Sequence, residues 1–272
     1  MASILPSPIS PSGEVANSRQ CRLAVGAGAA VLLSVSWAYV IFMAWGMENM
    51  DAVADSLLMP AMTGWDGRDL LLVFFMWAVM MIAMMLPSAM PLVLLVTKIN
   101  HGRFARNRAL LGIGVFALGY LAMWTGFSAL AALAQWALLE ARLVSPMMES
   151  ASPWLSVALL TAAGAYEFTP LKNACLARCQ SPLGYLMTGW REGISGAFAM
   201  GLRHGAYCTG CCWLLMALLF VFGVMNLAWI AALAIFVLLE KLLRRPAWFA
   251  RAAGATLLAW GALLAVQAGV LP

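Results

Sequence analysis

Five cysteines in two short clusters are the residues of this chain with the most specific chemistry. The first cluster is Cys175 and Cys179, which are four positions apart. The second is Cys208, Cys211 and Cys212, within one five-residue stretch. Thiolates are soft ligands that favour soft metal ions such as Cu(I). A single buried cysteine is an ordinary small hydrophobic residue, but two clusters indicate metal or redox chemistry.

A second set of soft donors lies upstream, in an apolar stretch rich in methionine. Met80 and Met84 are four positions apart, and Met81 and Met85 form an adjacent pair at the same interval. Residues four apart share one face of a helix, so these thioethers are candidate secondary or transit ligands. Methionine is also a flexible filler of apolar cores, which is the alternative. The total of 19 methionines in 272 residues strengthens the case for ligation.

The second cysteine cluster extends into a longer stripe of donors. His204, Cys208, Cys212 and Met216 step by four residues, so a helix would carry all of them on one face. Thiolates with a thioether or an imidazole form a soft site of two to four ligands. Zinc held by cysteines, with or without a histidine, is the alternative. Thioether is a poor zinc ligand, so we favour copper as Cu(I).

The elements that must position these donors are apolar helices. Hydrophobic residues make up 64% of the chain and charged residues 10%, with a mean hydropathy of +0.90. Soluble domains carry about 25% charged residues. We predict an all-α polytopic membrane bundle of about seven spans of ~20 residues, as one domain of residues 23–272 after a disordered cytoplasmic tail of residues 1–22. The predicted spans are residues 23–45, 70–96, 109–139, 154–168, 206–224, 227–239 and 248–270.

The basic residues predict how the bundle is oriented. All 16 lysines and arginines except Arg68 and Arg142 fall on one side of the predicted spans. The positive-inside rule assigns that side to the cytoplasm, so the N-terminus and both cysteine clusters are expected there, where thiols stay reduced. The net charge of +5 is spread over short connections and forms no basic tract. We therefore expect membrane lipids, and no nucleic acid, as partners.

Two carboxylates near the predicted membrane boundary have two interpretations each. Glu167 is either a functional group, as ionisable residues near the membrane often are, or a carboxylate at the interface paired with Lys172 or a nearby arginine. Glu240 is expected to cap its helix at the interface, paired with Lys241 or with basic loop residues. The chain contains no phosphate-binding loop, dinucleotide fingerprint or hydrolase motif, so we do not expect an enzyme.

Four segments form a combined pattern over roughly residues 70–245. They are the stretch from Trp77 to Ser88, the run from Pro170 to Cys179, the run from Cys208 to Trp213, and Met225-Asn226 leading to Glu240-Lys241. The pattern resembles a bacterial family of predicted metal-binding integral membrane proteins, the domain of unknown function 2182. The resemblance implies a multi-pass, metal-binding protein of the bacterial inner membrane, and it assigns no activity.

The function expected from these observations is copper handling inside a membrane. The protein would bind Cu(I) and deliver it to a membrane copper enzyme or serve that enzyme's assembly, with a soluble metal carrier as a candidate donor. One alternative is a thiol–disulfide redox protein that uses Cys208 and Cys211 with Cys175 and Cys179. The other is an accessory subunit of a larger membrane complex, in which the sulfur residues are structural.

Overall fold

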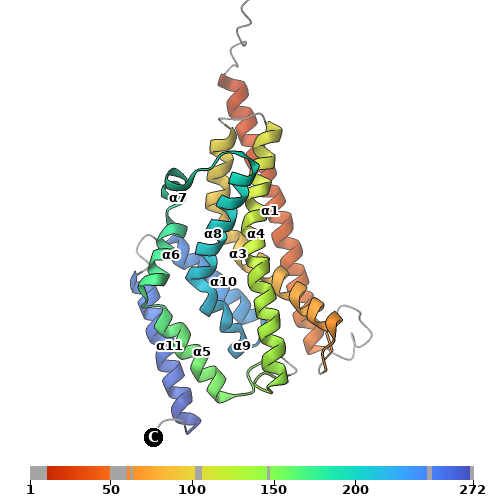
Figure 1. The fold of residues 1–272 in the computed structure, drawn as a ribbon, viewed down its shortest axis with the longest axis vertical. Coiled ribbons are helices and arrows are strands. Elements are labelled where there is room, and N and C mark those ends of the chain that lie inside the picture. The colour runs from red at the N-terminus through yellow and green to blue at the C-terminus, as the bar shows by residue number, and fades with distance from the viewer. Residues whose placement is uncertain are drawn as a thin grey trace, which may run out of the picture.

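The chain forms helices that pack together into one elongated bundle (Figure 1). The computed structural model describes residues 11–49, 60, 61, 64–101, 106–145, 148–243 and 247–269. Over these residues the fold is all-α, as predicted, with one isolated β-bridge between Val144 and Ser150. The helices are α1 (Pro11–Glu48), α3 (Gly67–His101), α4 (Arg106–Glu140), α5 (Pro153–Tyr166), α6 (Pro170–Gln180), α7 (Pro182–Gly189), α8 (Gly193–Ala217), α9 (Leu219–Phe222), α10 (Leu227–Leu242) and α11 (Ala247–Gln267).

Five of the described helical segments are long and apolar enough to cross a membrane, by length and composition. They are Arg19–Glu48, Gly67–Lys98, Leu110–Glu140, Gly193–Phe222 and Trp248–Gln267. The predicted fourth and sixth spans correspond to α5, with 14 residues, and α10, with 16. Both are shorter than the ~20 residues that a perpendicular span needs. The predicted count of about seven is therefore not reached on this criterion.

Two predicted boundaries differ from those observed. α1 begins at Pro11, so residues 11–22 of the predicted disordered tail are helical, while residues 1–10 lie outside the described residues. The predicted fifth span began at residue 206, whereas α8 begins at Gly193. Small residues together with Arg203 and His204 in that first part of α8 lower its apparent hydropathy, and a boundary set by hydropathy alone therefore came too late.

Local sequence signals explain where the shorter helices begin. Thr169 caps α6, since its hydroxyl oxygen accepts the backbone N–H of Lys172 at 3.3 Å, and Pro170 follows at the first helical position. At the start of α3, the Asp66 carboxylate accepts the backbone N–H groups of Asp69 at 3.0 Å and Arg68 at 2.8 Å. These hydrogen bonds hold the pKa of Asp66 below its ordinary value.

Helices α3, α4 and α8 form the centre of the bundle. α4 packs against both α8 and α3, and α1 lies along α3 (Figure 1). α6 packs against α8, and α10 packs against α3, so both lie beside the central helices. α5 and α11 pair with each other at the lower left of the view. The result is that α3, α6, α8 and α10 meet around one core.

The α4–α8 contact depends on glycines that let the two backbones approach closely. A methyl group on Gly119 would overlap the carbonyl oxygen of Phe198, and one on Gly201 would overlap that of Phe116. A methyl group on Gly126, also on α4, would meet no other atom within 4 Å. This close approach places Tyr120 of α4 against the middle of α8.

We expect Gly119→Ala to destabilise the protein and Gly126→Ala to leave it unchanged or more stable. The first adds a methyl group to a filled contact, which costs about 1–3 kcal/mol. The second replaces a helical glycine where there is room, a gain of up to about 1 kcal/mol. Unfolding of the two purified variants in the same detergent, followed by circular dichroism, measures both. If the two variants were equally stable, the close approach of the α4 and α8 backbones would not contribute to stability.

Candidate metal centre

The two cysteine clusters lie on helices that pack against each other. Cys175 and Cys179 are on α6, and the second cluster is on α8. A methyl group built on Gly210 would lie 3.0 Å from the Cys175 sulfur, so the thiol packs directly on α8 at a position without a side chain. Cys179 packs against the buried cluster that contains Cys211. The structure therefore brings both clusters together.

The methionines of α3 line the same core from the opposite side. All the sulfur residues of the α8 cluster and the predicted α3 set are at most 1% exposed: Met80, Met81, Met84, Met85, Cys208, Cys211 and Cys212. They belong to one cluster of packed side chains, with Cys175 and Cys179 at its edge. The Cys212 sulfur lies 4.0 Å from the Met85 sulfur. The six cysteines are all free thiols, Cys21 included.

Two further methionines join this core from α1. Met43 and Met47 are buried in the same cluster. They are four residues apart, which is the spacing that identified the α3 methionines, and Met50 follows three positions later. They were not among the predicted site residues, although this spacing was a signal that could have found them.

Cys208 has the most polar surroundings of the three α8 cysteines. The Lys241 ammonium donates a hydrogen bond to the Cys208 sulfur at 2.8 Å and another to the Ser88 hydroxyl at 3.0 Å. The Tyr120 hydroxyl lies 3.1 Å from the same sulfur and donates to the Met85 carbonyl at 3.2 Å. Side chains from α4 and α10 thus converge on one atom of α8, and each also donates a hydrogen bond to α3. An ammonium at this distance offsets the negative charge of a thiolate.

Lys241 and Tyr120 were not among the predicted site residues. Lys241 is in the last turn of an apolar helix, where a lysine usually marks a cytoplasmic boundary. Nothing in its neighbours along the chain indicates that its side chain turns inward. Tyr120 is one aromatic residue in a long apolar helix. Only the packing of α10 and α4 on the core identifies them.

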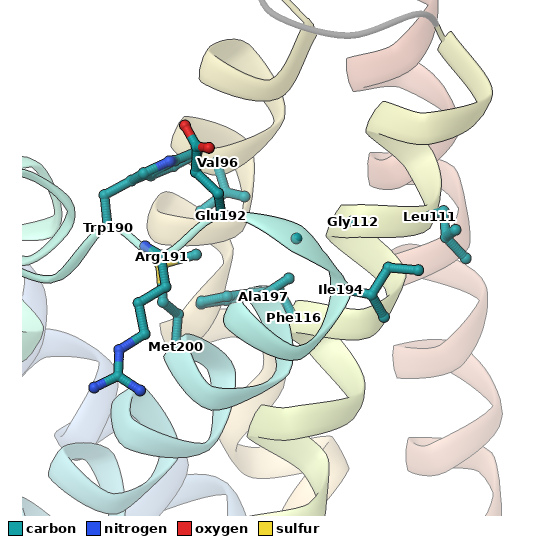
Figure 2. Close-up of a pocket in the computed structure, with 11 residues that line it drawn as sticks. Val96, Leu111, Gly112, Phe116, Trp190, Arg191, Glu192, Ile194, Ala197 and Met200 are labelled. Atoms are coloured by element: carbon teal, nitrogen blue, oxygen red, sulfur yellow. Dashed lines mark hydrogen bonds between the residues drawn. The ribbon is translucent and has the colours of Figure 1, made fainter.

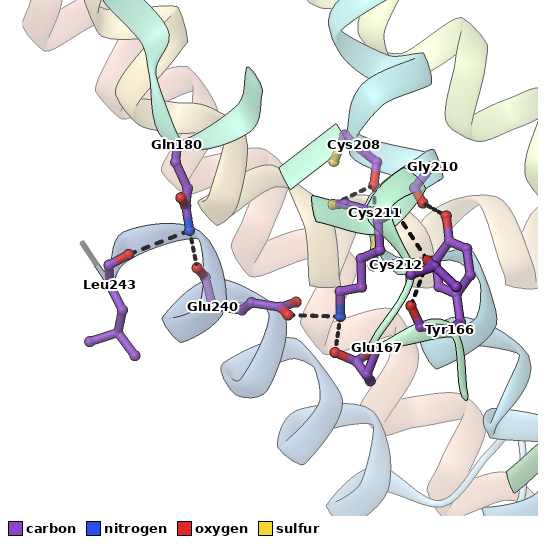
Figure 3. A network of polar contacts seen from close by, with 11 residues as sticks. Tyr166, Glu167, Gln180, Cys208, Gly210, Cys211, Cys212, Glu240 and Leu243 are labelled. Atoms are coloured by element: carbon purple, nitrogen blue, oxygen red, sulfur yellow. Dashed lines mark hydrogen bonds and ion pairs between the residues drawn. The ribbon is translucent and has the colours of Figure 1, made fainter. Parts of the chain in front are cut away.

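A second charged group lies beside the sulfur core. Lys172 is placed between Glu167 and Glu240, and its ammonium is 2.7 Å from a Glu240 oxygen and bonded to Glu167 (Figure 3). All three charged side chains are fully buried. The expected Glu167–Lys172 pair is therefore present, but in the core and not at an interface. Gln180 of α6 donates to the Glu240 carbonyl at 2.9 Å, which holds α10 against α6.

The expectation for Glu240 was right about the kind of partner and wrong about the location. Its partner is Lys172, a basic residue of the predicted loop after the fourth span, but the pair is buried and does not lie at the interface. Consecutive residues on a helix point in different directions. Glu240 can therefore face α6 while Lys241 faces α8, and the two neighbours serve different charged groups.

His204 lies one helical turn before Cys208 and is surrounded by aromatic rings. Its ring centroid is 5.5 Å from that of Tyr185, 5.7 Å from Tyr120 and 6.4 Å from Phe116. The side chain is 4% exposed, and Nδ1 has no hydrogen-bond partner. Buried polar atoms usually have partners. The unpartnered nitrogen leaves His204 as the one imidazole of the described part of the core that is free to take a ligand.

The donors present fit a soft ion better than a hard one. Over the described residues, no three His, Cys, Asp or Glu side chains are grouped as a ready-made metal site. The sulfur atoms instead combine thiols with thioethers, as Cys212 and Met85 do. Mixed thiol and thioether ligation is typical of Cu(I). Burial of these donors would keep a bound ion away from water.

Comparison with known families agrees with this chemistry. A family model described as PpoB2, a copper chaperone, matches residues 74–264. The chain belongs to the PpoB2 copper chaperone family. The sequence resembled a bacterial family of predicted metal-binding membrane proteins, the domain of unknown function 2182. The match supports a copper-related bacterial family but not that name. No curated protein and no solved structure matches the chain. All ten predicted site residues and the buried Glu–Lys–Glu group lie inside the segment shared with the PpoB2 family.

We expect Lys172→Met to destabilise this PpoB2-family protein strongly. Removing the ammonium leaves Glu167 and Glu240 buried without a counter-charge, which costs about 3–5 kcal/mol. The triple variant Glu167→Gln/Lys172→Met/Glu240→Gln removes all three charges and should recover most of that loss. Unfolding in detergent measures both. If the triple variant is no more stable than Lys172→Met, the loss of stability comes from the changed shape of the side chains and not from unpaired buried charge.

Proposed function

We propose that this protein is a membrane-embedded Cu(I) chaperone that receives the ion on its thiols and passes it to a membrane copper enzyme or its assembly. The observation that carries the proposal is the convergence of two cysteine clusters and the α3 methionines in one buried core. Membership of a copper chaperone family supports the same assignment. The ion is cargo, which the protein must release as well as bind.

The two kinds of sulfur would have different tasks. The thiolates of Cys175, Cys179, Cys208, Cys211 and Cys212 would hold the ion, because an anionic sulfur is the stronger ligand. The thioethers of Met80, Met81, Met84 and Met85 carry no charge and bind reversibly, so they suit transfer between weak sites. A buried thiolate is costly without a counter-charge, and Lys241 supplies one to Cys208 at 2.8 Å.

We further propose an inner-membrane protein with its N-terminus in the cytoplasm. The five apolar helical segments and the one-sided distribution of lysine and arginine support this orientation. The thiols would then receive copper from a soluble carrier in the cytosol. The chain has no ATP-binding motif, so delivery would follow differences in affinity between donor, protein and recipient. No catalytic role is proposed.

The first test is the metal content of the protein purified in mild detergent under reducing, anaerobic conditions. We expect near-stoichiometric copper in the wild type and its loss in Cys208→Ser/Cys211→Ser. Cys21→Ser is the matched control, since Cys21 is buried on α1 away from both clusters, and it should keep its copper. Zinc in place of copper, or no metal in a wild type that forms a disulfide on mild oxidation, would contradict the proposal.

A second test separates copper transfer from thiol–disulfide chemistry. Met85→Leu keeps the volume of the side chain and removes the sulfur 4.0 Å from Cys212. We expect Cu(I) affinity to fall roughly tenfold, about 1.4 kcal/mol, in competition with a Cu(I) chelator. Met187→Leu, at a residue 78% exposed on α7, should have no effect. A redox protein would not require the Met85 thioether, so unchanged affinity would favour that alternative.

A further inference from the structure

A cavity opens at the end of the bundle where α8 begins. Its volume is about 320 Å3, and it lies between the end of α3, the start of α4 and the connection from α7 to α8. The walls are mostly apolar, and Arg191 and Glu192 provide the charged groups. Figure 2 shows Arg191 and Met200 on the same side of this cavity. The Arg191 backbone N–H lies 3.4 Å from the Met200 sulfur, so that sulfur faces the connection at the cavity.

A second cavity adjoins the first and shares two residues with it. It has a volume of about 400 Å3 and is lined by Arg203 and by Met123 of α4, together with Arg191 and Met200. Met200 is therefore a wall of both cavities, although its side chain is only 4% exposed. The Met200 thioether would therefore contact a small solute that entered either cavity.

Met200 continues the donor stripe of α8 by one more turn. Met200, His204, Cys208, Cys212 and Met216 follow one another at intervals of four residues, and all are buried. An interval of four corresponds to a rise of about 6 Å along the helix. The face of α8 that carries Cys208 and Cys212 therefore extends back to Met200, at the wall of the two cavities.

His204 connects the two ends of this path. It lies between Met200 and Cys208 on the same face, and its Nδ1 has no hydrogen-bond partner. The Tyr120 ring packs on the His204 ring at 5.7 Å, while the Tyr120 hydroxyl lies 3.1 Å from the Cys208 sulfur. The imidazole and the thiol thus share a neighbour, and no charged side chain separates them in these contacts.

We propose that Cu(I) enters through these cavities and is first bound by Met200, then passed through His204 to Cys208. The inference rests on the proposed function and adds the entry site and its first ligand. Each step is a ligand exchange, in which a new copper–sulfur or copper–nitrogen bond forms as the previous copper–ligand bond breaks. Copper stays in the +1 state throughout, and neither Met200 nor neutral His204 gains or loses a proton. Cys208 receives the ion as a thiolate, whose charge the Lys241 ammonium offsets at 2.8 Å, so no proton is released in the last step. The geometry assigns Met200 a role in the rate of loading and not in the final capacity.

Stopped-flow loading of the full-length protein in detergent tests this assignment. The probe is the Cu(I)–bicinchoninate complex, whose visible absorbance falls as the protein removes copper. We expect Met200→Leu to slow loading about tenfold and to leave the final copper stoichiometry unchanged. Met200→Cys restores a soft donor and should recover most of the rate. Met123→Leu is the matched control, because Met123 lines the second cavity from α4 and lies off the α8 face.

Each outcome separates this inference from the proposed function. A wild type that takes no copper from the probe overturns both. A wild type that loads, with Met200→Leu as fast as Met123→Leu, overturns the entry path and leaves the chaperone function standing. His204→Phe provides a second variant, since a phenyl ring fits the aromatic surroundings and lacks the nitrogen. Slow loading of His204→Phe with unchanged capacity would support the path even if Met200→Leu folds poorly, and normal loading would overturn it.

Discussion

The contact between the Lys241 ammonium and the Cys208 sulfur joins the charged and the sulfur-rich parts of this core. An ammonium and a thiolate are each costly to bury alone, and each reduces the cost of the other. The same ammonium reaches Ser88 on α3, and the same sulfur reaches Tyr120 on α4. Four helices are therefore held in one arrangement by groups that meet at Cys208. The arrangement of the remaining donors follows from it.

The buried Glu–Lys–Glu group has a complementary part in this architecture. Lys172 comes from α6, between the capping residue Thr169 and the first cysteine cluster, and Glu240 comes from α10. Its ion pairs hold α6 against α10 while Gly210 lets Cys175 approach α8. These charges therefore fix α6, which carries the first cysteine cluster, in a medium of low polarity where interactions between charges are strong.

A core built this way combines packing with candidate metal ligands. Methionine fills space between helices and also presents a soft donor, so in the function proposed above the same α3 residues would stabilise the bundle and pass copper. Glycines at the α4–α8 contact bring Tyr120 and His204 beside each other and beside Cys208. In that function the ion would lie among buried donors of different strength that follow one another at regular intervals along α8.

The sequence by itself determined the helical class, the apolar segments and the grouping of donors on single helix faces. These features depend on composition and on the interval of four residues, both of which are local. It also predicted the Glu167–Lys172 pair, which joins residues five positions apart. The family match agrees with the soft-metal chemistry that the clusters indicated.

Only the tertiary structure decided which faces meet. Tyr120 and Cys208 are 88 positions apart, and Cys212 and Met85 are 127 apart. No local pattern encodes such pairs, because they depend on how α4 and α3 pack on α8. Packing also turned Glu240 and Lys241 in different directions and placed Met200 on the wall of two cavities. Burial of charge and close backbone approach are properties of the assembled bundle, which is why sequence analysis identified the donors but not their surroundings.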